Sequence, residues 1–495
     1  MDNDCNAPLS PLLSVAAIRD VERRHAHEPL MERAGAAAAD IAFAMLAGRN
    51  GRAIVLAGPG NNGGDAYVCA RHLHERGVSV TVVATAEPLS GRVAATANAR
   101  VANLSIQCVR VPPADVPGLI VDGLFGVGLS RPLAAPWSTW VEWANASGAP
   151  ILALDVPSGL DASTGVAHAP AIAATATATF IALKPGLLTC DGPDRCGDTS
   201  VHPLGVDVQS SATGVRLQWT GLEPLLPAIL GRRVRKTHKG TFGRACIIGG
   251  AEGLVGAALL AGRAALRLGA GRVVVGLAAR NPPLIDWLAP ELMLRDANAL
   301  GEDHDAWVAG PGMGGGERAL ALVEKAIAVL QPLVLDADAL NAIAGDSTLL
   351  RAVASRAAAT VATPHPAEAA RLLQCATADV QADRVGAATR LASLLRAHVV
   401  LKGAGSIVVR PDQTFDINAS GNPALATAGS GDVLAGILGA LLAQGIDADL
   451  ALRIGVCLHG AAADALVAQG IGPLGLTASE LAPAARRLLN DARSA

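Results

Sequence analysis

The first half of the chain alternates short apolar runs with longer stretches in which apolar residues recur at helical spacing. An alanine-rich helical opening comes first, over residues 14–47. We expect strands, each followed by a turn and a return to helix, at residues 53–57, 78–84, 119–121 and 151–154. This order is typical of a parallel, doubly wound sheet, in which ligands bind beyond the carboxyl ends of the strands. Three loops that begin there are expected to converge on one crevice, at residues 58–65, 122–132 and 155–161.

A second alternation follows a break in the pattern. Residues 207–226 are rich in Gln, Ser, Thr, Gly and Pro, and we expect the linker there. A helix is expected over residues 255–268. Strands are expected at residues 245–248, 272–277, 307–309, 333–335, 360–362 and 399–402. A chain of 495 residues is comfortable for two domains. The prediction is an α/β protein with domains at residues 1–215 and 226–495, the first a Rossmann-like doubly wound sheet.

Composition and charge exclude several classes of function. The net charge is −3, and no dense Lys/Arg stripe carries interleaved aromatics, so nucleic-acid binding is disfavoured. The short basic run at 232–236 fits a solvated or phosphate-facing segment. The longest uncharged apolar stretch, residues 433–443, is too short to span a bilayer, and residues 1–4 do not resemble a signal peptide. Eight scattered cysteines without a CxxC pair predict reduced thiols and a cytoplasmic location.

Two glycine-rich turns that end in aspartate stand out, one in each half. The first runs from Gly58 to Asp65, with the sequence GPGNNGGD, and the second is Gly429-Ser430-Gly431-Asp432. Backbone amides at a helix N-terminus attract anions, and glycine lets a phosphate approach them closely. An aspartate beside such amides is better placed to take a proton, hold a cation or bind a hydroxyl. The pair of turns predicts two nucleotide-handling sites.

Two further segments of the first half carry candidate chemistry. The loop 126–132 holds Arg131, which could pair with a phosphate, although a plain surface turn fits the same residues. Asp122, Ser158 and an asparagine oxygen would make an all-oxygen site for a hard cation, whose identity the chemistry leaves open.

Together these segments, with the opening at residues 30–35, resemble the NAD(P)H-hydrate epimerase domain over about residues 10–215. The resemblance implies a potassium site at Asn62, Asp122 and Ser158. It implies that the hydrated nicotinamide nucleotide contacts Asn61, Asn62, Gly63, Gly64, Asp65, Gly126, Val127, Gly128, Leu129, Ser130, Arg131, Pro132 and Asp155. Ala66 departs from the family pattern, which usually has a third glycine there, and its methyl group is expected to tighten the pocket.

The second turn suits phosphoryl transfer. Gly-Ser-Gly amides at a helix start form an anion hole, and Asp432 after them can accept the proton of an attacking hydroxyl. A well-capped helix with Asp432 in its first turn is the structural alternative. The turn resembles the ribokinase-like superfamily, specifically the ADP-dependent NAD(P)H-hydrate dehydratase domain, over about residues 226–490. Supporting motifs are KGTFGR at 239–244, GPGMG at 310–314, TPHPAE at 363–368 and LKGAGS at 401–406.

This resemblance implies a ribokinase-like α/β sandwich for the second domain and two groups of binding residues. The adenine nucleotide is expected at Lys402, Gly403, Ala404, Gly405, Ser406 and Gly431. The hydrated dinucleotide is expected near Ala257, Gly312, His365 and Asp432. On chemistry alone, His365 also fits a loop histidine with satisfied hydrogen bonds.

The two resemblances together imply repair of hydrated NADH and NADPH. ADP would phosphorylate the C6 hydroxyl of the S form with Asp432 as base and magnesium accompanying the nucleotide, and phosphate would then leave, giving AMP, phosphate and NAD(P)H. The first domain would interconvert the R and S forms, with Asp155 either handling the proton or only binding the substrate. A homo-oligomer without nucleic-acid or membrane partners is expected. The rival hypotheses are a ribokinase-like small-molecule kinase with a fused nucleotide-binding module, and a non-enzymatic first half.

Overall fold

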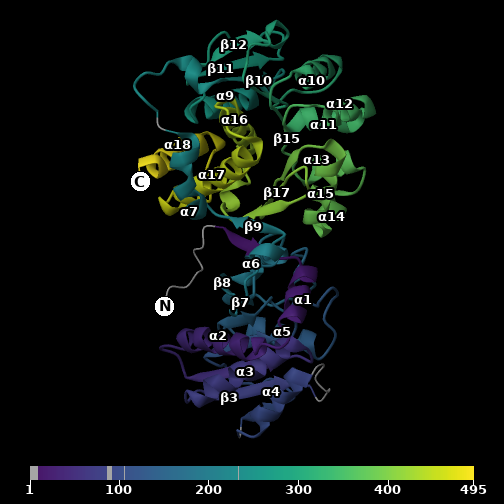
Figure 1. Ribbon diagram of the computed structural model, residues 1–495, viewed down its shortest axis with the longest axis vertical. Helices are drawn as coiled ribbons and strands as arrows, with labels where there is room; N and C mark the ends of the chain where they lie inside the picture. Colours follow the sequence, from purple (N-terminus) through teal and green to yellow (C-terminus); the bar gives the residue numbers. More distant parts are fainter. Residues whose placement is uncertain (1–8, 86–91, 105, 232, 495) are drawn as a thin grey trace. The chain divides into compact units, whose positions relative to one another are not determined.

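The computed structural model describes residues 9–85, 92–104, 106–231 and 233–494 (Figure 1). It divides into two compact units, residues 1–215 and 216–495. Two segments discussed above, residues 1–4 and Arg232 in the basic run, lie outside the described residues. Each unit is an α/β layer structure, which confirms the predicted fold class.

The N-terminal unit is built on a parallel sheet. Its strand order is β4-β3-β2-β5-β6-β7-β8. The bounds are β2 Arg52–Ala57, β3 Ser79–Ala84, β4 Gln107–Val109, β5 Leu119–Gly123, β6 Ile151–Leu154, β7 Ala176–Phe180 and β8 Asp198–His202. A short strand, β1 (Ser10–Leu12), precedes them. The direction of winding reverses between β2 and β5, so their carboxyl ends define the switch point where such folds place ligands.

Helices cover both faces of this sheet. Alternate residues of β2 pack against helices α2, α3 and α4 on one face and against α5 on the other. The bounds are α1 Val15–Arg24, α2 Leu30–Met45, α3 Asn61–Glu75, α4 Arg92–Ala102, α5 Trp137–Ala146 and α6 Gly192–Cys196. The predicted opening helix over 14–47 is two helices, because Pro29 stands at the N-cap of α2 and separates it from α1.

The C-terminal unit has a larger sheet, with the order β9-β18-β17-β16-β15-β14-β13-β10-β11-β12. The bounds are β9 Gly214–Leu217, β10 Arg244–Gly249, β11 Arg272–Leu277, β12 Met293–Asp296, β13 Ala306–Ala309, β14 Leu333–Leu335, β15 Thr360–Ala362, β16 His398–Leu401, β17 Ser406–Val409 and β18 Phe415–Asn418. The sheet is parallel from β12 to β16, whereas β17 runs antiparallel to both β16 and β18.

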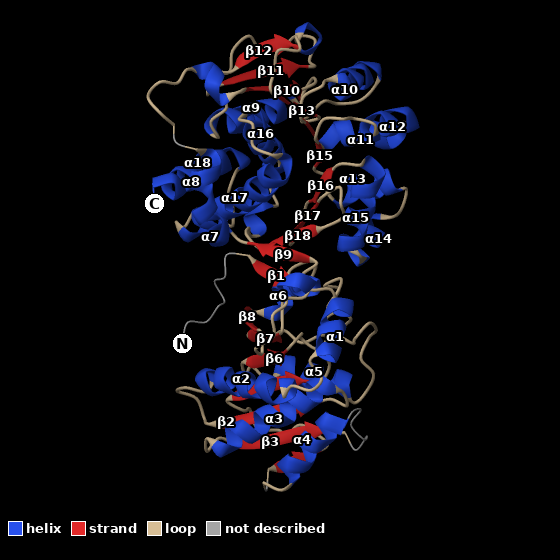
Figure 2. Ribbon diagram, in the orientation of Figure 1, coloured by secondary structure: helices blue, strands red, loops and turns tan. Residues whose placement is uncertain are grey.

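Helices lie on both sides of this sheet as well, α9, α16 and α17 on one side and α10 to α13 and α15 on the other (Figure 2). The bounds are α7 Trp219–Leu222, α8 Leu226–Leu230, α9 Val255–Arg267, α10 Glu317–Ala328, α11 Ala337–Gly345, α12 Ser347–Ala354, α13 Pro366–Leu373, α14 Thr377–Ala382, α15 Arg384–Leu395, α16 Ser430–Ala443, α17 Ala448–Ala468 and α18 Ala478–Ser494.

Two further features differ from the sequence expectations. The segment taken for an irregular linker contains β9, which pairs with β18 through Arg216 and Leu217, and Leu217, Trp219 and Leu222 in this segment are buried. In addition, α17 is long and apolar enough by composition to cross a membrane. However, 72% of its most apolar 18-residue stretch is buried inside the protein. Charged residues interrupt the apolar sequence of α17, so it contains no long uncharged stretch. The burial matches that of a core helix, and α17 packs against α16 and α18.

Candidate active sites

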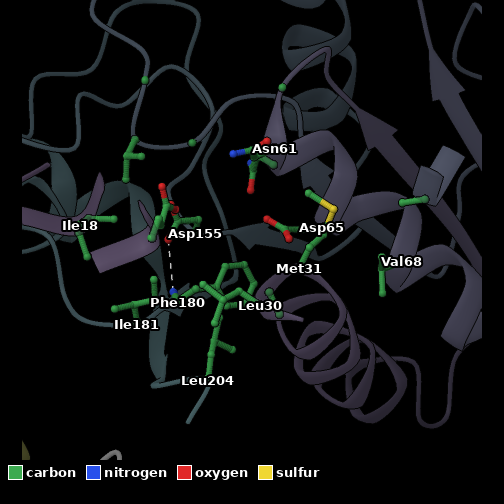
Figure 3. A pocket seen from close by; sticks show the side chains of 18 of the residues that line it. Ile18, Leu30, Met31, Asn61, Asp65, Val68, Asp155, Phe180, Ile181 and Leu204 are labelled. Atoms are coloured by element: carbon green, nitrogen blue, oxygen red, sulfur yellow. Dashed lines mark hydrogen bonds between the residues drawn. The ribbon is translucent and has the colours of Figure 1, made fainter. Parts of the chain in front are cut away.

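A cavity of about 920 Å³ lies in the N-terminal unit, at the switch point of its sheet (Figure 3). All three predicted loops contribute to its lining. The first supplies residues 59–62 and Asp65, the second supplies residues 124–129, and the third supplies Asp155. Helices α1 and α2 close it with Ile18, Leu30 and Met31, among others. The expected convergence of strand-end loops on one crevice is therefore present.

The glycines of the first turn make tight packing possible. A Cβ atom at Gly58 would lie 1.7 Å from the carbonyl oxygen of Leu124, and one at Gly63 would lie 1.9 Å from that of Gly58. A Cβ atom at Gly64 would lie 2.5 Å from Cε of Met31. Gly63 and Gly64 are buried and do not line the cavity, whereas Asn61, Asn62 and Asp65 do.

Asp155 follows β6 with a positive φ of 63°, which turns its side chain into the cavity. Its Oδ1 is ion-paired with Lys184 and accepts a hydrogen bond of 3.2 Å from the backbone N–H of Phe180. Lys184 is fully buried, and its Nζ also donates to Thr179 Oγ1 at 2.9 Å and to the Phe180 carbonyl at 2.7 Å. Every proton of this ammonium therefore has an acceptor, which fixes Asp155 in place.

Two more carboxyl groups face the same cavity. Asp65 projects from the first turn of α3, and Glu22 projects from α1. Burial, the charge of Asp155 and that of Glu22 raise the pKa of Asp65 well above its usual range. Burial and the charge of Asp155 also raise the pKa of Glu22. Three acids around one lysine favour the protonated form of at least one of them.

Beneath the cavity lie the three residues expected to hold a cation. Asp122 and Ser158 are fully buried, and Ser158 donates to Asp122 from its hydroxyl at 2.7 Å and from its backbone N–H at 2.8 Å. Burial raises the pKa of Asp122 to about 6, against the lowering effect of these hydrogen bonds. The side-chain oxygen and nitrogen of Asn62 are buried without a hydrogen-bond partner in the described chain. A buried carboxylate, a hydroxyl and an unsatisfied amide oxygen fit a hard cation.

The loop 126–132 contributes only its first part to the cavity. Gly126, Val127, Gly128 and Leu129 line it, whereas Ser130, Arg131 and Pro132 do not and are exposed. A different arginine, Arg19 of α1, lines the cavity, and its Nη2 would lie 3.8 Å from a Cβ at Gly128. Before this loop, Phe125 packs edge-on against Trp137, with 5.2 Å between ring centroids and an interplanar angle of 89°.

A smaller cavity, of about 360 Å³, lies in the C-terminal unit around the second glycine turn. Gly429 has a φ of 88°, and a Cβ there would lie 2.6 Å from Leu260, so the turn requires glycine. Gly431 faces the charged part of the site, because its Cβ position is 3.1 Å from Lys402 Nζ. Asp432 lines the cavity from the first turn of α16. Burial and the nearby charge of Asp336 raise its pKa to about 6.

Lys402 lies close to two carboxyl groups of this second site. Its Nζ lies 2.8 Å from Asp336 Oδ1 and 4.0 Å from Glu368 Oε2. Burial disfavours its charge, but Asp336 and Glu368 outweigh burial and raise the pKa of Lys402. Glu368 also accepts a 2.8 Å hydrogen bond from the backbone N–H of His365, and burial with the charge of Lys402 lowers the pKa of His365. The cavity thus pairs a permanent cation with carboxylates beside the helix start.

Some of the residues predicted for this domain line the cavity, and others do not. His365, Lys402, Gly403, Gly431 and Asp432 line it. Ala404 and Gly405 form the turn between β16 and β17, and Ser406 begins β17. Ala257 and Gly312 lie together beyond β10 and β13, since a Cβ at Gly312 would come within 2.9 Å of the Ala257 side chain.

Sequence reasoning missed several charged residues that the structure brings into the two cavities, among them Lys184, Glu22, Asp336 and Glu368. Asp336 had a usable signal, because it follows a predicted strand directly. Glu368 stood in a quoted motif without an assigned role. Lys184 and Glu22 had no comparable signal, since their positions depend on a turn after β7 and on the docking of α1.

Clusters of His, Cys, Asp and Glu side chains are the usual ligands of tightly bound metal ions. Across residues 9–85, 92–104, 106–231 and 233–494, no three His, Cys, Asp or Glu side chains are grouped so that they could hold a metal ion. Magnesium, however, is usually bound by one or two carboxylates together with substrate phosphates. Asp336 and Glu368 beside the glycine turn fit that description.

The fold and the two sites define a two-domain α/β enzyme with a nucleotide-type cavity in each domain. Comparisons with known proteins agree. The family described as NAD(P)H-hydrate dehydratase matches residues 245–485, and the family described as YjeF-related protein N-terminus matches residues 27–186. The chain is 38% identical to the bifunctional NAD(P)H-hydrate repair enzyme Nnr of Coxiella burnetii, over 96% of this chain and 98% of that protein. It is 39% identical to the enzyme of the same name from Escherichia coli, over 88% and 85%. The chain belongs to the family of bifunctional NAD(P)H-hydrate repair enzymes.

A solved structure resembles the C-terminal part. It is the ADP/ATP-dependent NAD(P)H-hydrate dehydratase of Bacillus subtilis, co-crystallised with ATP and Mg²⁺. The two are 31% identical with a TM-score of 0.49, and the match covers 56% of this chain and 98% of that one.

Proposed function

We propose that this protein repairs hydrated NADH and NADPH in two steps. Residues 1–215 would interconvert the R and S forms at C6, and residues 226–495 would dehydrate the S form at the expense of ADP. The observation that carries the proposal is the presence of two separate cavities, each lined by a glycine turn and an aspartate, in a chain of this family. Hydrated NADH or NADPH and ADP are the proposed ligands, and the enzyme is proposed to be a cytoplasmic homo-oligomer.

The dehydratase step follows from leaving-group chemistry. Hydroxide leaves carbon poorly, whereas phosphate leaves well. Asp432 would take the proton of the C6 hydroxyl, whose oxygen attacks the terminal phosphorus of ADP while AMP departs. The phosphate then leaves C6 as a proton is lost from C5, which restores the ring double bond. Amides of the 429–431 turn would stabilise the transferring group, and Lys402 would neutralise its charge.

The proposed binding residues divide between the two cavities. In the second, Lys402, Gly403, Ala404, Gly405, Ser406 and Gly431 would hold ADP, and Ala257, Gly312, His365 and Asp432 would hold the hydrate. Magnesium bound with the nucleotide would supply charge neutralisation, and the residues that fit it are Asp336 and Glu368. In the first, the residues 61–65, 126–132 and Asp155 would bind the hydrate.

Potassium is proposed for the epimerase site. It would supply a fixed positive charge beneath the substrate, held by Asn62, Asp122 and Ser158. The unsatisfied buried amide of Asn62 supports this assignment, because a buried polar group without a partner is costly.

The deciding experiment is recovery of reduced nicotinamide absorbance from NADPH hydrate with ADP, with ATP and without nucleotide. We expect recovery only when a nucleotide is present, together with release of phosphate. Accumulation of a stable phosphorylated product without recovery would instead indicate a small-molecule kinase.

A further inference from the structure

Two carboxyl groups face each other across the N-terminal cavity. Asp65 projects from the start of α3, and Asp155 from the end of β6, so they reach the cavity from different elements (Figure 3). The carboxyl group of Asp65 points toward Asp155 in this view. The two groups also interact through their charges, because the charge of Asp155, together with burial, raises the pKa of Asp65. A flat ring held between them would present one face to each.

We propose that Asp65 and Asp155 form a two-sided acid–base pair that removes and adds the C6 hydroxyl on opposite faces of the hydrated nicotinamide ring. This inference rests on the epimerase function proposed above, and it adds Asp65 as a second catalytic residue.

The two carboxyl groups have different surroundings. Asp155 is ion-paired with the buried Lys184. The carboxyl group of Asp65 receives no hydrogen bond or ion pair from any residue that the structure describes, and the apolar side chains of Met31 and Val68 line the cavity beside it. An unpaired acid on one side and an ion-paired carboxylate on the other is the arrangement that two opposite proton transfers require. Burial acts in the same direction, since it raises the pKa of Asp65.

The reaction balances without any further reagent. The proton of Asp65 moves to the C6 hydroxyl oxygen, the C6–O bond breaks, and the lone pair of the ring nitrogen N1 forms an N1=C6 double bond as water leaves. A water molecule then attacks C6 from the opposite face, the N1=C6 electron pair returns to N1, and Asp155 accepts the proton of the incoming water. The other epimer results. The reverse reaction uses the same residues with exchanged roles, and proton exchange with solvent resets the pair.

The test uses the full chain with potassium and without ADP, starting from each separated hydrate epimer. Asp65→Asn and Asp155→Asn should each lower kcat for inversion by about 10²–10⁴-fold in both directions, the usual contribution of an acid–base residue. KM should change little, because an amide keeps the shape of the carboxyl group. Asp65→Glu, which retains an acid, should recover part of the activity. Asp40→Asn, on the exposed side of α2, is the matched control and should behave as the wild type.

Oxygen exchange separates catalysis from binding. In ¹⁸O-labelled water, wild-type enzyme should incorporate the label at C6 with each inversion. Each single variant retains one working face, so each should label one epimer only, and the two variants should label opposite epimers. Labelling of one epimer by each variant would also show that its N-terminal unit, which carries the site, is folded.

Three results would overturn the pair. They are inversion by wild type without ¹⁸O incorporation, an Asp65→Asn variant with raised KM but unchanged kcat, and labelling of both epimers by Asp65→Asn, which would move the role to a group such as Glu22. Failure of the wild type to equilibrate the epimers is a different outcome, because it would refute the epimerase function itself.

Discussion

At the scale of single residues, the two sites use aspartates in contrasting environments. Asp155 forms an ion pair with the buried Lys184. Asp432 is half-buried, and burial together with the charge of Asp336 raises its pKa. Asp432 therefore holds a proton more readily than an ordinary aspartate, which suits a group that must accept one from a hydroxyl.

Replacing Asp432 tests its proposed role as the base. Asp432→Asn should reduce ADP-driven recovery of reduced nicotinamide by about 10²–10⁴-fold, because the amide cannot accept the hydroxyl proton. Equilibration of the R and S hydrates by the same protein should continue at the wild-type rate. Loss of both activities would contradict the separation of the two sites.

His459 provides a prediction about pH and stability. It is buried in α17, where burial lowers its pKa from 6.5 to about 4. Between about pH 6.5 and pH 4, His459 is therefore protonated in the unfolded chain and neutral in the folded chain. Because the unfolded chain binds more protons in this range, stability falls as the pH drops from 6.5 toward 4. The full effect corresponds to about 3 kcal/mol, of which about 2 kcal/mol is lost at pH 5.

The measurement compares thermal unfolding at pH 7 and pH 5. His459→Gln should show a smaller drop in unfolding temperature between the two pH values than wild type. The same replacement at the exposed His27 should leave the drop unchanged. Equal pH dependence in all three proteins would exclude His459 as the source.

At the scale of secondary-structure elements, the turn between β2 and α3 depends on glycine for packing rather than for backbone angles. Gly58 has no room for a Cβ against Leu124, while Gly60, two residues later, has nothing within 4 Å of that position and a φ of −100°. The two glycines form a natural matched pair, since only one of them is sterically required.

Gly58→Ala should therefore destabilise the N-terminal unit by about 3 kcal/mol, because the backbone of Leu124 must move. Gly60→Ala should change stability by no more than about 1 kcal/mol. Urea unfolding of both variants, followed by far-UV circular dichroism, gives the comparison. Similar losses in both would mean that the turn tolerates no side chain for some reason other than this contact.

The same scale shows what the sequence could predict. Buried parallel strands such as β6 were predicted because they are continuous apolar runs that end in a polar residue, whereas the parallel strands β4, β7, β8 and β12 were not predicted. The antiparallel β17 was not, since hydrophobicity alone does not specify the direction of a neighbouring strand. β9 was missed because its short alternation lies in a polar segment.

For the sites, aspartates directly after strands could be predicted, because the fold brings strand ends together. The partner of Asp155 could not. Lys184 lies 29 positions away, and its ammonium reaches the cavity only through a local turn after β7. Likewise, Arg131 was expected to pair with a phosphate, but no sequence signal pointed to Arg19 of α1, which lines the cavity.

At the scale of the whole molecule, one chain carries two activities that share a substrate. With equal amounts of R and S hydrate and excess ADP, wild type should restore all of the reduced cofactor. Asp155→Asn should restore the S half rapidly and leave the R half to slow spontaneous epimerisation. The amplitude of the fast absorbance phase measures this directly.

Mixing experiments extend the prediction. Adding Asp432→Asn protein to Asp155→Asn protein should return the fast phase to full amplitude, because each supplies the site that the other lacks. An amplitude that stays at one half would mean that the hydrate must pass between sites within one chain.

The edge-on contact between Phe125 and Trp137 has a practical consequence. Phe125 lines the epimerase cavity, whereas Trp137 stands behind it in the first turn of α5. A ligand that shifts the Phe125 ring changes the surroundings of an indole that it never touches. Tryptophan emission thus offers an optical readout of occupancy in this cavity, and Trp137→Phe identifies the responding fluorophore among the six tryptophans of the chain.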